Sequence, residues 1–151
     1  MLSKDKILIG RRELAVLPDF GLEQVKVKVD TGAYTSSIHV SSCHEQDGQL
    51  KVIFLDDKHA AYTGQEMNFT KFRTKKVKSS TGQTQERYFV FGTICIADLC
   101  FQTEFSLTVR KGMRYPILLG RKVLNNRFIV DTSKNIFTSH LPYKHENCHL
   151  I

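Results

Sequence analysis

Hydrophobic and polar residues alternate along much of the chain. The clearest case is QVKVKVD, residues 24–30, in which the three valines share one face and Lys26, Lys28 and Asp30 share the other. A period of two residues is typical of a β-strand with one buried face. This segment is therefore predicted to be a strand that ends at Asp30.

The same pattern predicts further strands. KVIFLDD, residues 51–57, follows a predicted hairpin turn at Asp47 and Gly48, and RFIVD, residues 127–131, is a strand near the C-terminus. A long β-rich run, residues 86–110, lies between them.

A glycine and a turn within the β-rich run, and a helical segment after it, complete the fold prediction. Gly92 is expected to form a bulge, and Ala97 with Asp98 a turn, while Phe105, Leu107 and Val109 alternate with polar residues. The one convincing helical segment is GRKVLNNRF, residues 120–128, with Asn125 or Asn126 as a left-handed cap. The pattern indicates a mainly β fold, a small barrel or sandwich, with one short helix near the C-terminus.

Composition narrows the class of protein. The chain has 151 residues, enough for one domain with its own core, and no apolar run reaches the length of a membrane span. The first residues lack the core of a signal peptide, so a soluble, cytoplasmic protein is expected. Of the four cysteines, Cys95 and Cys100 flank the predicted turn and are expected to be close but reduced.

Asp30, Thr31 and Gly32 are the first candidate for chemistry. Three such residues are also ordinary at the turn after a strand. Here they precede the small polar residues 35–37, and YPILLGRKVL, residues 115–124, follows downstream with an apolar run, Gly120 and the predicted helix. An aspartic-protease lobe has this layout.

Four stretches carry a resemblance to a known family. They are IGRRELAVLPDFGL (9–22), VKVDTGAYTSSIH (27–39), KVKSSTGQTQER (76–87) and YPILLGRKVL (115–124). Because it has these four stretches in this order, the chain resembles the retropepsin-like aspartic proteases that are also named ATP-dependent zinc proteases. The resemblance implies a small closed β-barrel of the acid-protease type over residues 1–138, followed by a tail, residues 139–151. The chain departs from the family at Leu14, where Trp is usual, and at Tyr34, where Arg is usual.

The resemblance implies hydrolysis of peptide bonds by a pair of aspartates that share a proton. Asp30 would be the catalytic residue, in a loop formed with Thr31, Gly32 and Ala33. Asp131 lacks a following Gly and lies beyond the predicted helix, so it is rejected as the second aspartate. A homodimer is therefore expected, in which each subunit contributes Asp30 across a two-fold axis.

The resemblance also suggests residues that contact a substrate. Tyr34 lies four residues after Asp30, and Lys28 lies two residues before it. The polar segment 78–87 is either a flap over the cleft or a plain surface hairpin; its candidates are Ser79, Ser80, Gly82 and Arg87. For Arg87 and Arg121, a structural salt bridge is the alternative that the sequence favours.

The family name mentions zinc and ATP, but the sequence has no motif that binds either of them. No metal and no cofactor are therefore predicted. The sequence has neither a His-Glu-x-x-His pattern nor a phosphate-binding glycine loop. His39 is expected to be a packed histidine. The tail contains His140, His145, Cys148 and His149, and an exposed tail is the favoured interpretation.

The net charge of +7 favours acidic partners. The basic run at residues 71–78 is interpreted as a solvated strand face, and nucleic acid is not expected to be a partner. Relatives are associated with glutamate ligation, so Lys26 and Lys28 are expected to attract an acidic, glutamate-rich peptide in a salt-dependent manner. Two alternatives stay open: a binding module without catalysis, and a metal-dependent hydrolase.

Overall fold

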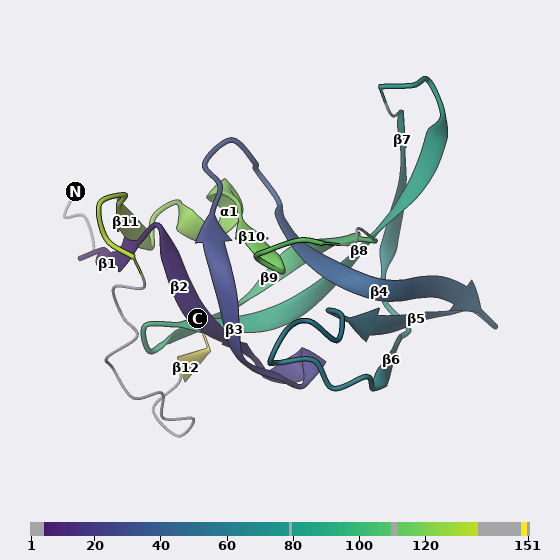
Figure 1. Cartoon of the computed structure of the whole chain (residues 1–151), viewed down its shortest axis with the longest axis horizontal. Helices are drawn as coiled ribbons and strands as arrows, with labels where there is room; N and C mark the ends of the chain where they lie inside the picture. The colour runs from purple at the N-terminus through teal and green to yellow at the C-terminus, as the bar shows by residue number, and fades with distance from the viewer. Residues whose placement is uncertain (1–4, 79, 110–111, 136–148, 151) are drawn as a thin grey trace.

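The computed structural model describes residues 5–78, 80–109, 112–135 and the backbone of 149–150 (Figure 1). No helix among these residues is long and apolar enough to cross a membrane. The described chain is mainly β, as the alternation of residues predicts.

The described residues form strands joined by short connections, one α-helix and one 3-10 helix. The strands are β1 (Ile7–Gly10), β2 (Arg12–Leu17), β3 (Leu22–Val29), β4 (Ser36–Gln46), β5 (Gln49–Phe54), β6 (Glu66–Phe69), β7 (Arg73–Lys78), β8 (Thr84–Ile96), β9 (Leu99–Thr108), β10 (Ile117–Leu119), β11 (Phe128–Asp131) and β12 (His149–Leu150). The helices are η1 (Pro18–Phe20) and α1 (Arg121–Leu124).

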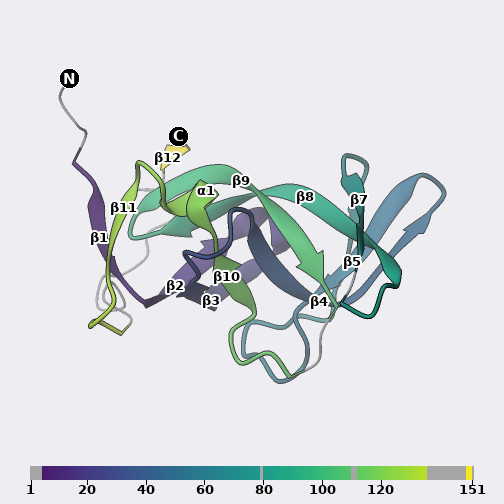
Figure 2. The same cartoon turned by 90° about the horizontal axis from the view of Figure 1, so that it is seen from above.

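Six strands close on themselves. Strands β9, β8, β2, β3, β10 and β4 are hydrogen-bonded in that order, and β4 pairs back with β9. Closure removes the free sheet edges of this group. The structure is therefore the small closed barrel with one short helix that the family resemblance implies, and Figure 2 shows the barrel from above.

Strand β10 occupies a special place in the barrel, because it lies between two strands that are consecutive in sequence. It pairs in parallel with β3, Leu118 beside Lys28, and antiparallel with β4, Leu118 beside Ser37. The connection from β3 to β4, residues 30–35, therefore passes over the end of β10 and the start of α1. This connection carries Asp30.

The barrel interior is filled by the apolar faces of the strands. Val25 and Val27 of β3 are fully buried, whereas Lys26 and Lys28, which follow them, are exposed. Phe20 of η1 stacks on Phe54, with ring centroids 4.3 Å apart. The expected alternation fails in β9, since residues 103–107 are all buried and Val109 is 65% exposed.

Gly92 is not a bulge, because β8 and β9 pair without a register shift across Gly92 and Thr103. A Cβ atom at Gly92 would lie 2.4 Å from the Phe20 ring. The glycine is thus explained by the close approach of an aromatic ring, which the sequence pattern around Gly92 does not reveal.

The predicted turns are confirmed. Asp47 and Gly48 join β4 to β5 with positive φ angles, as do Ala97 and Asp98 between β8 and β9. Asn126, rather than Asn125, has the left-handed conformation after α1. Strand β11 matches the predicted RFIVD strand and pairs with β1.

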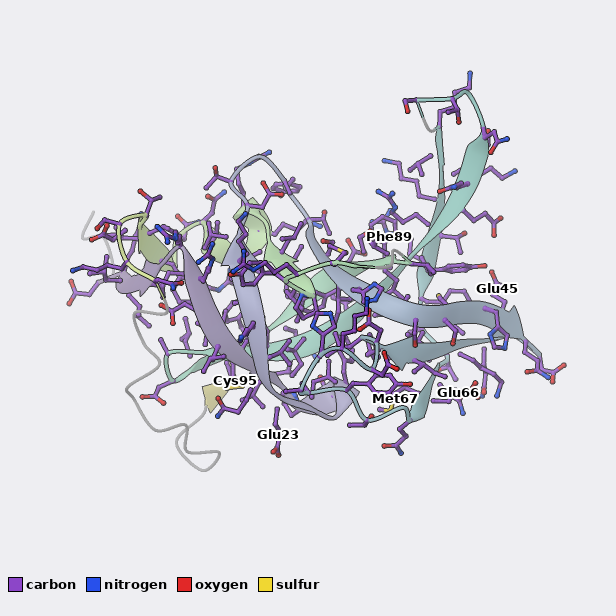
Figure 3. The ribbon with its side chains drawn as sticks, viewed as in Figure 1. Glu23, Glu45, Glu66, Met67, Phe89 and Cys95 are labelled. Carbon is purple, nitrogen blue, oxygen red and sulfur yellow. A yellow bond between two sulfur atoms is a disulfide. The ribbon has the colours of Figure 1, made fainter. Side chains whose placement is uncertain are left out.

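Cys95 and Cys100 lie opposite each other in β8 and β9, as expected, but the structure joins them by a disulfide. The prediction that these two cysteines are reduced is therefore wrong for this structure. Figure 3 shows Cys95 and Phe89 in different parts of β8, with Phe89 near the base of a projecting hairpin.

That hairpin is formed by β7 and the first half of β8, and it extends away from the barrel (Figure 1). The boundary predicted between residues 138 and 139 lies outside the described residues, so it stays a prediction. The last described residues, β12, pair in parallel with β9 at Leu99 and Cys100.

Candidate active site

Asp30 lies directly after β3, at the end of the β3–β10 pair. Its backbone N–H donates to the carbonyl of Leu119 over 2.9 Å, which continues the strand pairing by one residue. The Asp30 residue is half-buried. The strand therefore presents the carboxylate at the rim of the barrel, where an external molecule can reach it.

The loop after Asp30 folds back on its carboxylate. The N–H of Gly32 donates to Asp30 Oδ1 over 3.1 Å, and the N–H of Ala33 donates to the Asp30 carbonyl over 3.2 Å. A Cβ atom at Gly32 would lie 3.3 Å from Asp30 Oδ1, which is closer than most real contacts. The small residue thus permits the backbone to approach the carboxylate.

The first turn of α1 holds this loop in place through hydrogen bonds. The N–H groups of Arg121 and Lys122 donate to the carbonyls of Ala33 and Tyr34, each over 2.9 Å. The Arg121 guanidinium also donates to the carbonyl of Thr31 over 2.8 Å. Arg121 therefore has a structural role in the Asp30 loop, through hydrogen bonds to backbone carbonyls and not through the expected salt bridge.

Gly120 marks the closest approach between α1 and the loop. Its N–H donates to the buried Ser36 Oγ over 2.9 Å, a bond between residues 84 apart in sequence. A Cβ atom here would lie 2.6 Å from the Tyr34 carbonyl oxygen. No residue with a side chain fits without moving the loop.

The predicted substrate-contact residues fall into two groups. Lys28 and Tyr34 flank the Asp30 loop: Lys28 is exposed on β3 opposite Arg12, and Tyr34 is 55% exposed with the Lys122 ammonium 5.2 Å from its ring centroid. Both side chains are thus exposed close in sequence to Asp30, and their contact with a substrate stays a prediction.

The second group lies in the β7–β8 hairpin. Ser80, Gly82 and Arg87 are exposed there, and Ser79 lies outside the described residues. Among the described residues, no hydrogen bond or ion pair engages the side chain of Arg87, so it makes no structural salt bridge with them. Figures 1 and 2 show the hairpin tip and the Asp30 loop as separate projections of one chain.

An ion-pair network that the sequence analysis missed connects these two projections. The buried Glu104 of β9 accepts two hydrogen bonds from Arg73 at the base of the hairpin, over 3.0 and 3.1 Å. It accepts a third from Lys122 of α1 over 3.2 Å. The hydrogen bonds from Arg73, together with the one from Lys122, lower the pKa of Glu104. The only sign of this network in the sequence is that Glu104 is a single acidic residue between Phe101 and Phe105.

The remaining candidates have structural explanations. His39 is 2% exposed, and its ring contacts Asp56 Oδ2 at 2.9 Å and the Thr108 carbonyl at 3.2 Å, as expected for a packed histidine. Asp131 accepts two hydrogen bonds from Ser133, and these lower its pKa. Within the described part of the chain, no three side chains of the metal-binding types lie together.

Comparison with known proteins agrees with this geometry. Residues 8–140 match the family described as "Retropepsin-like aspartic endopeptidase RimB". A Legionella pneumophila protein of unknown function has a similar solved structure, with a TM-score of 0.63 and 25% identity; the match covers 89% of this chain and 100% of the other.

Two curated relatives carry the name "Probable alpha-L-glutamate ligase". The one from Shewanella pealeana is 30% identical over 140 residues, which are 89% of this chain and 30% of the relative. The one from Parasynechococcus marenigrum is 30% identical over 132 residues, 83% of this chain and 28% of the relative. The chain thus spans less than a third of the length of these relatives.

Proposed function

Because the chain belongs to the family of the retropepsin-like aspartic endopeptidase RimB, we propose that it hydrolyses peptide bonds by acid–base catalysis at Asp30. The observation that supports this most directly is the Asp30 loop, in which Gly32 donates to the carboxylate and α1 fixes the loop backbone. A carboxylate held this firmly at a barrel rim is suited to act on a bound water.

The reaction needs two carboxyl groups. One carboxylate takes a proton from water as the oxygen attacks the scissile carbonyl carbon, and a protonated carboxyl donates its proton to the carbonyl oxygen. The resulting tetrahedral intermediate then expels the amine, which takes up a proton. We propose that the second carboxyl is Asp30 of another copy of the chain, related by a two-fold axis.

We propose an acidic, glutamate-containing peptide as the substrate. Lys28 and Arg12 are partners in the pairing of β3 with β2, close in sequence to Asp30, and their positive charge supports this proposal. The name "Probable alpha-L-glutamate ligase" of the relatives supports a substrate that contains glutamate.

The test is cleavage of a peptide pool that includes glutamate-rich peptides, followed by mass spectrometry at several pH values. Wild type is compared with Asp30→Asn, which keeps the size of the side chain but cannot serve as a base. The proposal expects cut peptides from wild type and none from the variant. Equal cutting by both proteins would remove Asp30 from the mechanism.

The same experiment separates the two alternatives. If neither protein cuts any peptide while both still bind acidic peptides, the chain is a binding module of this fold. If cutting survives Asp30→Asn but stops with a chelator, the chain is a metal-dependent hydrolase, as the zinc in the family's other name suggests.

A further inference from the structure

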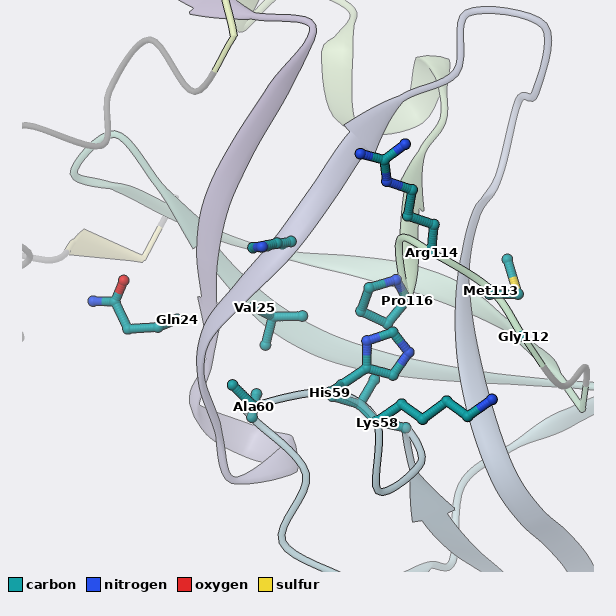
Figure 4. Close-up of a pocket in the computed structure, with 12 residues that line it drawn as sticks. Gln24, Val25, Lys58, His59, Ala60, Gly112, Met113, Arg114 and Pro116 are labelled. Atoms are coloured by element: carbon teal, nitrogen blue, oxygen red, sulfur yellow. The ribbon is translucent and has the colours of Figure 1, made fainter.

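A pocket of about 430 Å³ opens beside β3, where Gln24, Val25 and Lys26 form part of its lining (Figure 4). Its walls come from β3, from the connection after β5 and from the segment before β10. The residues that matter for its chemistry are Lys26, Lys58, His59, Met113, Arg114 and Pro116. This volume lies in the range of pockets that hold small ligands or side chains.

The charge of this pocket has one sign. Lys26, Lys58 and Arg114 supply three cations, and no Asp or Glu is among the lining residues. The side-chain nitrogens of these three residues make no ion pair or hydrogen bond with the described part of the chain; Arg114 only approaches the Tyr115 ring, at 5.7 Å. Three cations around one hollow favour an anionic occupant.

His59 provides a second, independent observation. Its side chain is 13% exposed, and its Nε2 atom is buried without a hydrogen-bond partner in the described structure. The neighbouring Asp56 oxygen is 3.8 Å away, too far for a hydrogen bond, and Asp56 is already engaged by His39 and by the N–H of Lys58. A buried ring nitrogen of this kind usually has a partner.

The pocket is aligned with the candidate active site. Lys26 and Lys28 share one face of β3 and Asp30 directly follows the strand, so at about 3.3 Å per residue Lys26 lies about 13 Å from Asp30 along the chain. An extended peptide advances by the same distance per residue. A peptide that follows this face of β3 would therefore reach the pocket about four residues from the bond at Asp30.

Further cations lie between the pocket and the residues beside Asp30. The Arg12 guanidinium lies 5.0 Å from the centroid of the Tyr115 ring, and the guanidinium of Arg114 lies near the same ring. Arg12 in turn pairs across the strands with Lys28. The cations of the pocket are thus joined through Tyr115 to those beside Asp30.

We propose that this pocket is a subsite for an acidic side chain of a peptide substrate, at a position about four residues from the scissile bond. The carboxylate would be held by Lys26 and Arg114 at the mouth, with His59 at the wall. The inference rests on the proposed function of Asp30 as a peptidase, and it adds the residues that select an acidic substrate away from the cut.

The test measures binding without cleavage. The full chain with Asp30→Asn is titrated into fluorescein-labelled octaglutamate, with labelled octaglutamine as the neutral probe, and anisotropy gives the Kd. Lys26→Gln with Arg114→Gln removes two pocket charges. The matched control, Lys71→Gln with Lys134→Gln, removes two exposed charges from residues outside the pocket.

The proposal expects the pocket variant to weaken octaglutamate binding about tenfold or more, since hydrogen bonds to charged groups are lost. The control should change the Kd by less than about twofold at the same ionic strength, because screened distant charges contribute little. Equal weakening in both variants, or an unchanged Kd in the pocket variant, would overturn the subsite.

Cleavage of octaglutamate by chains with Asp30 intact separates this inference from the proposed function. Cleavage with an unchanged KM in the pocket variant would leave the peptidase standing and reject the subsite. Pocket-dependent binding without any cleavage would keep the pocket as a binding site for acidic side chains and reject the catalytic role of Asp30.

Discussion

At the scale of single residues, Gly120 connects the helix to the loop that carries Asp30. In Gly120→Ala the new Cβ atom would lie 2.6 Å from the Tyr34 carbonyl oxygen, so the loop must move. We expect a loss of about 1–3 kcal/mol in the free energy of unfolding, as for other overpacked sites. We expect kcat/KM to fall about a hundredfold, since small misplacements of catalytic groups are costly. Urea unfolding and peptide cleavage measure the two effects.

Gly32→Ala is the comparison for this variant, because its Cβ atom would lie at the milder distance of 3.3 Å from Asp30 Oδ1. It should cost less stability than Gly120→Ala. If Gly120→Ala unfolds and cleaves like wild type, the loop does not depend on this close approach.

Glu104 gives a prediction that depends on pH. Its folded pKa is lowered, chiefly by the hydrogen bonds from Arg73, so its ionised form stabilises the fold. This contribution is present above the unfolded pKa of about 4.3 and is lost as the pH falls through the lowered folded value. We expect Glu104→Gln to lose about 1–2 kcal/mol at pH 7, a range that allows for the exposure of Arg73.

Urea unfolding of wild type and Glu104→Gln from pH 7 down to pH 3 measures this difference. It should shrink as the pH falls below about 4.3, where Glu104 becomes protonated in the unfolded chain. Glu66→Gln is the control, because Glu66 is an exposed acid whose Lys51 contact is 3.7 Å long. A Glu104→Gln deficit that stays constant across this range would show that packing, and not the ion pairs, explains it.

At the scale of elements, the β7–β8 hairpin tests whether a projecting segment covers the substrate. Lys78 pairs with Thr84, so residues 79–83 form its tip. Replacing these five residues by Asn-Gly, which suits a two-residue turn, should leave stability within about 0.5 kcal/mol. We expect kcat/KM to fall at least about tenfold if the tip closes over the cleft.

The control for the shortened hairpin is the turn between β8 and β9. Ala97 and Asp98 both have positive φ angles, so Asn-Gly fits there without shortening the chain. That variant should cleave like wild type. Full activity of the shortened β7–β8 hairpin would instead support the alternative of a plain surface hairpin.

The elements also show how far local sequence patterns reach. The strand before Asp30, the turns at residues 47–48 and 97–98, and the short helix follow from alternation and turn residues. Gly92 does not, because its partner is the ring of Phe20, 72 positions away in the chain. A local pattern cannot distinguish a glycine in a bulge from one beneath a distant aromatic ring.

At the scale of the whole molecule, the same limit applies to the candidate site. The Asp30 loop was predicted from its own residues and the resemblance, whereas the residues that hold it come from distant segments. Ser36 meets Gly120 across 84 residues, and Arg73 meets Glu104 across 31. Such pairs depend on which strands become neighbours in the closed barrel, and one sequence does not specify them.

The pairing of two Asp30 residues is a property of an assembly, and mixing subunits tests it. Wild type and Asp30→Asn are unfolded together in equal amounts, refolded and assayed at constant total protein. If each centre needs Asp30 from both subunits, random pairing leaves about a quarter of the dimers with two aspartates, and activity falls to about a quarter. A catalyst that acts as a monomer keeps about half. Refolding wild type with Lys134→Gln, an exposed site, is the control that should keep full activity. A value near one half in the Asp30→Asn mixture would rule out the shared dyad, and one chain would then have to supply both proton-transfer groups.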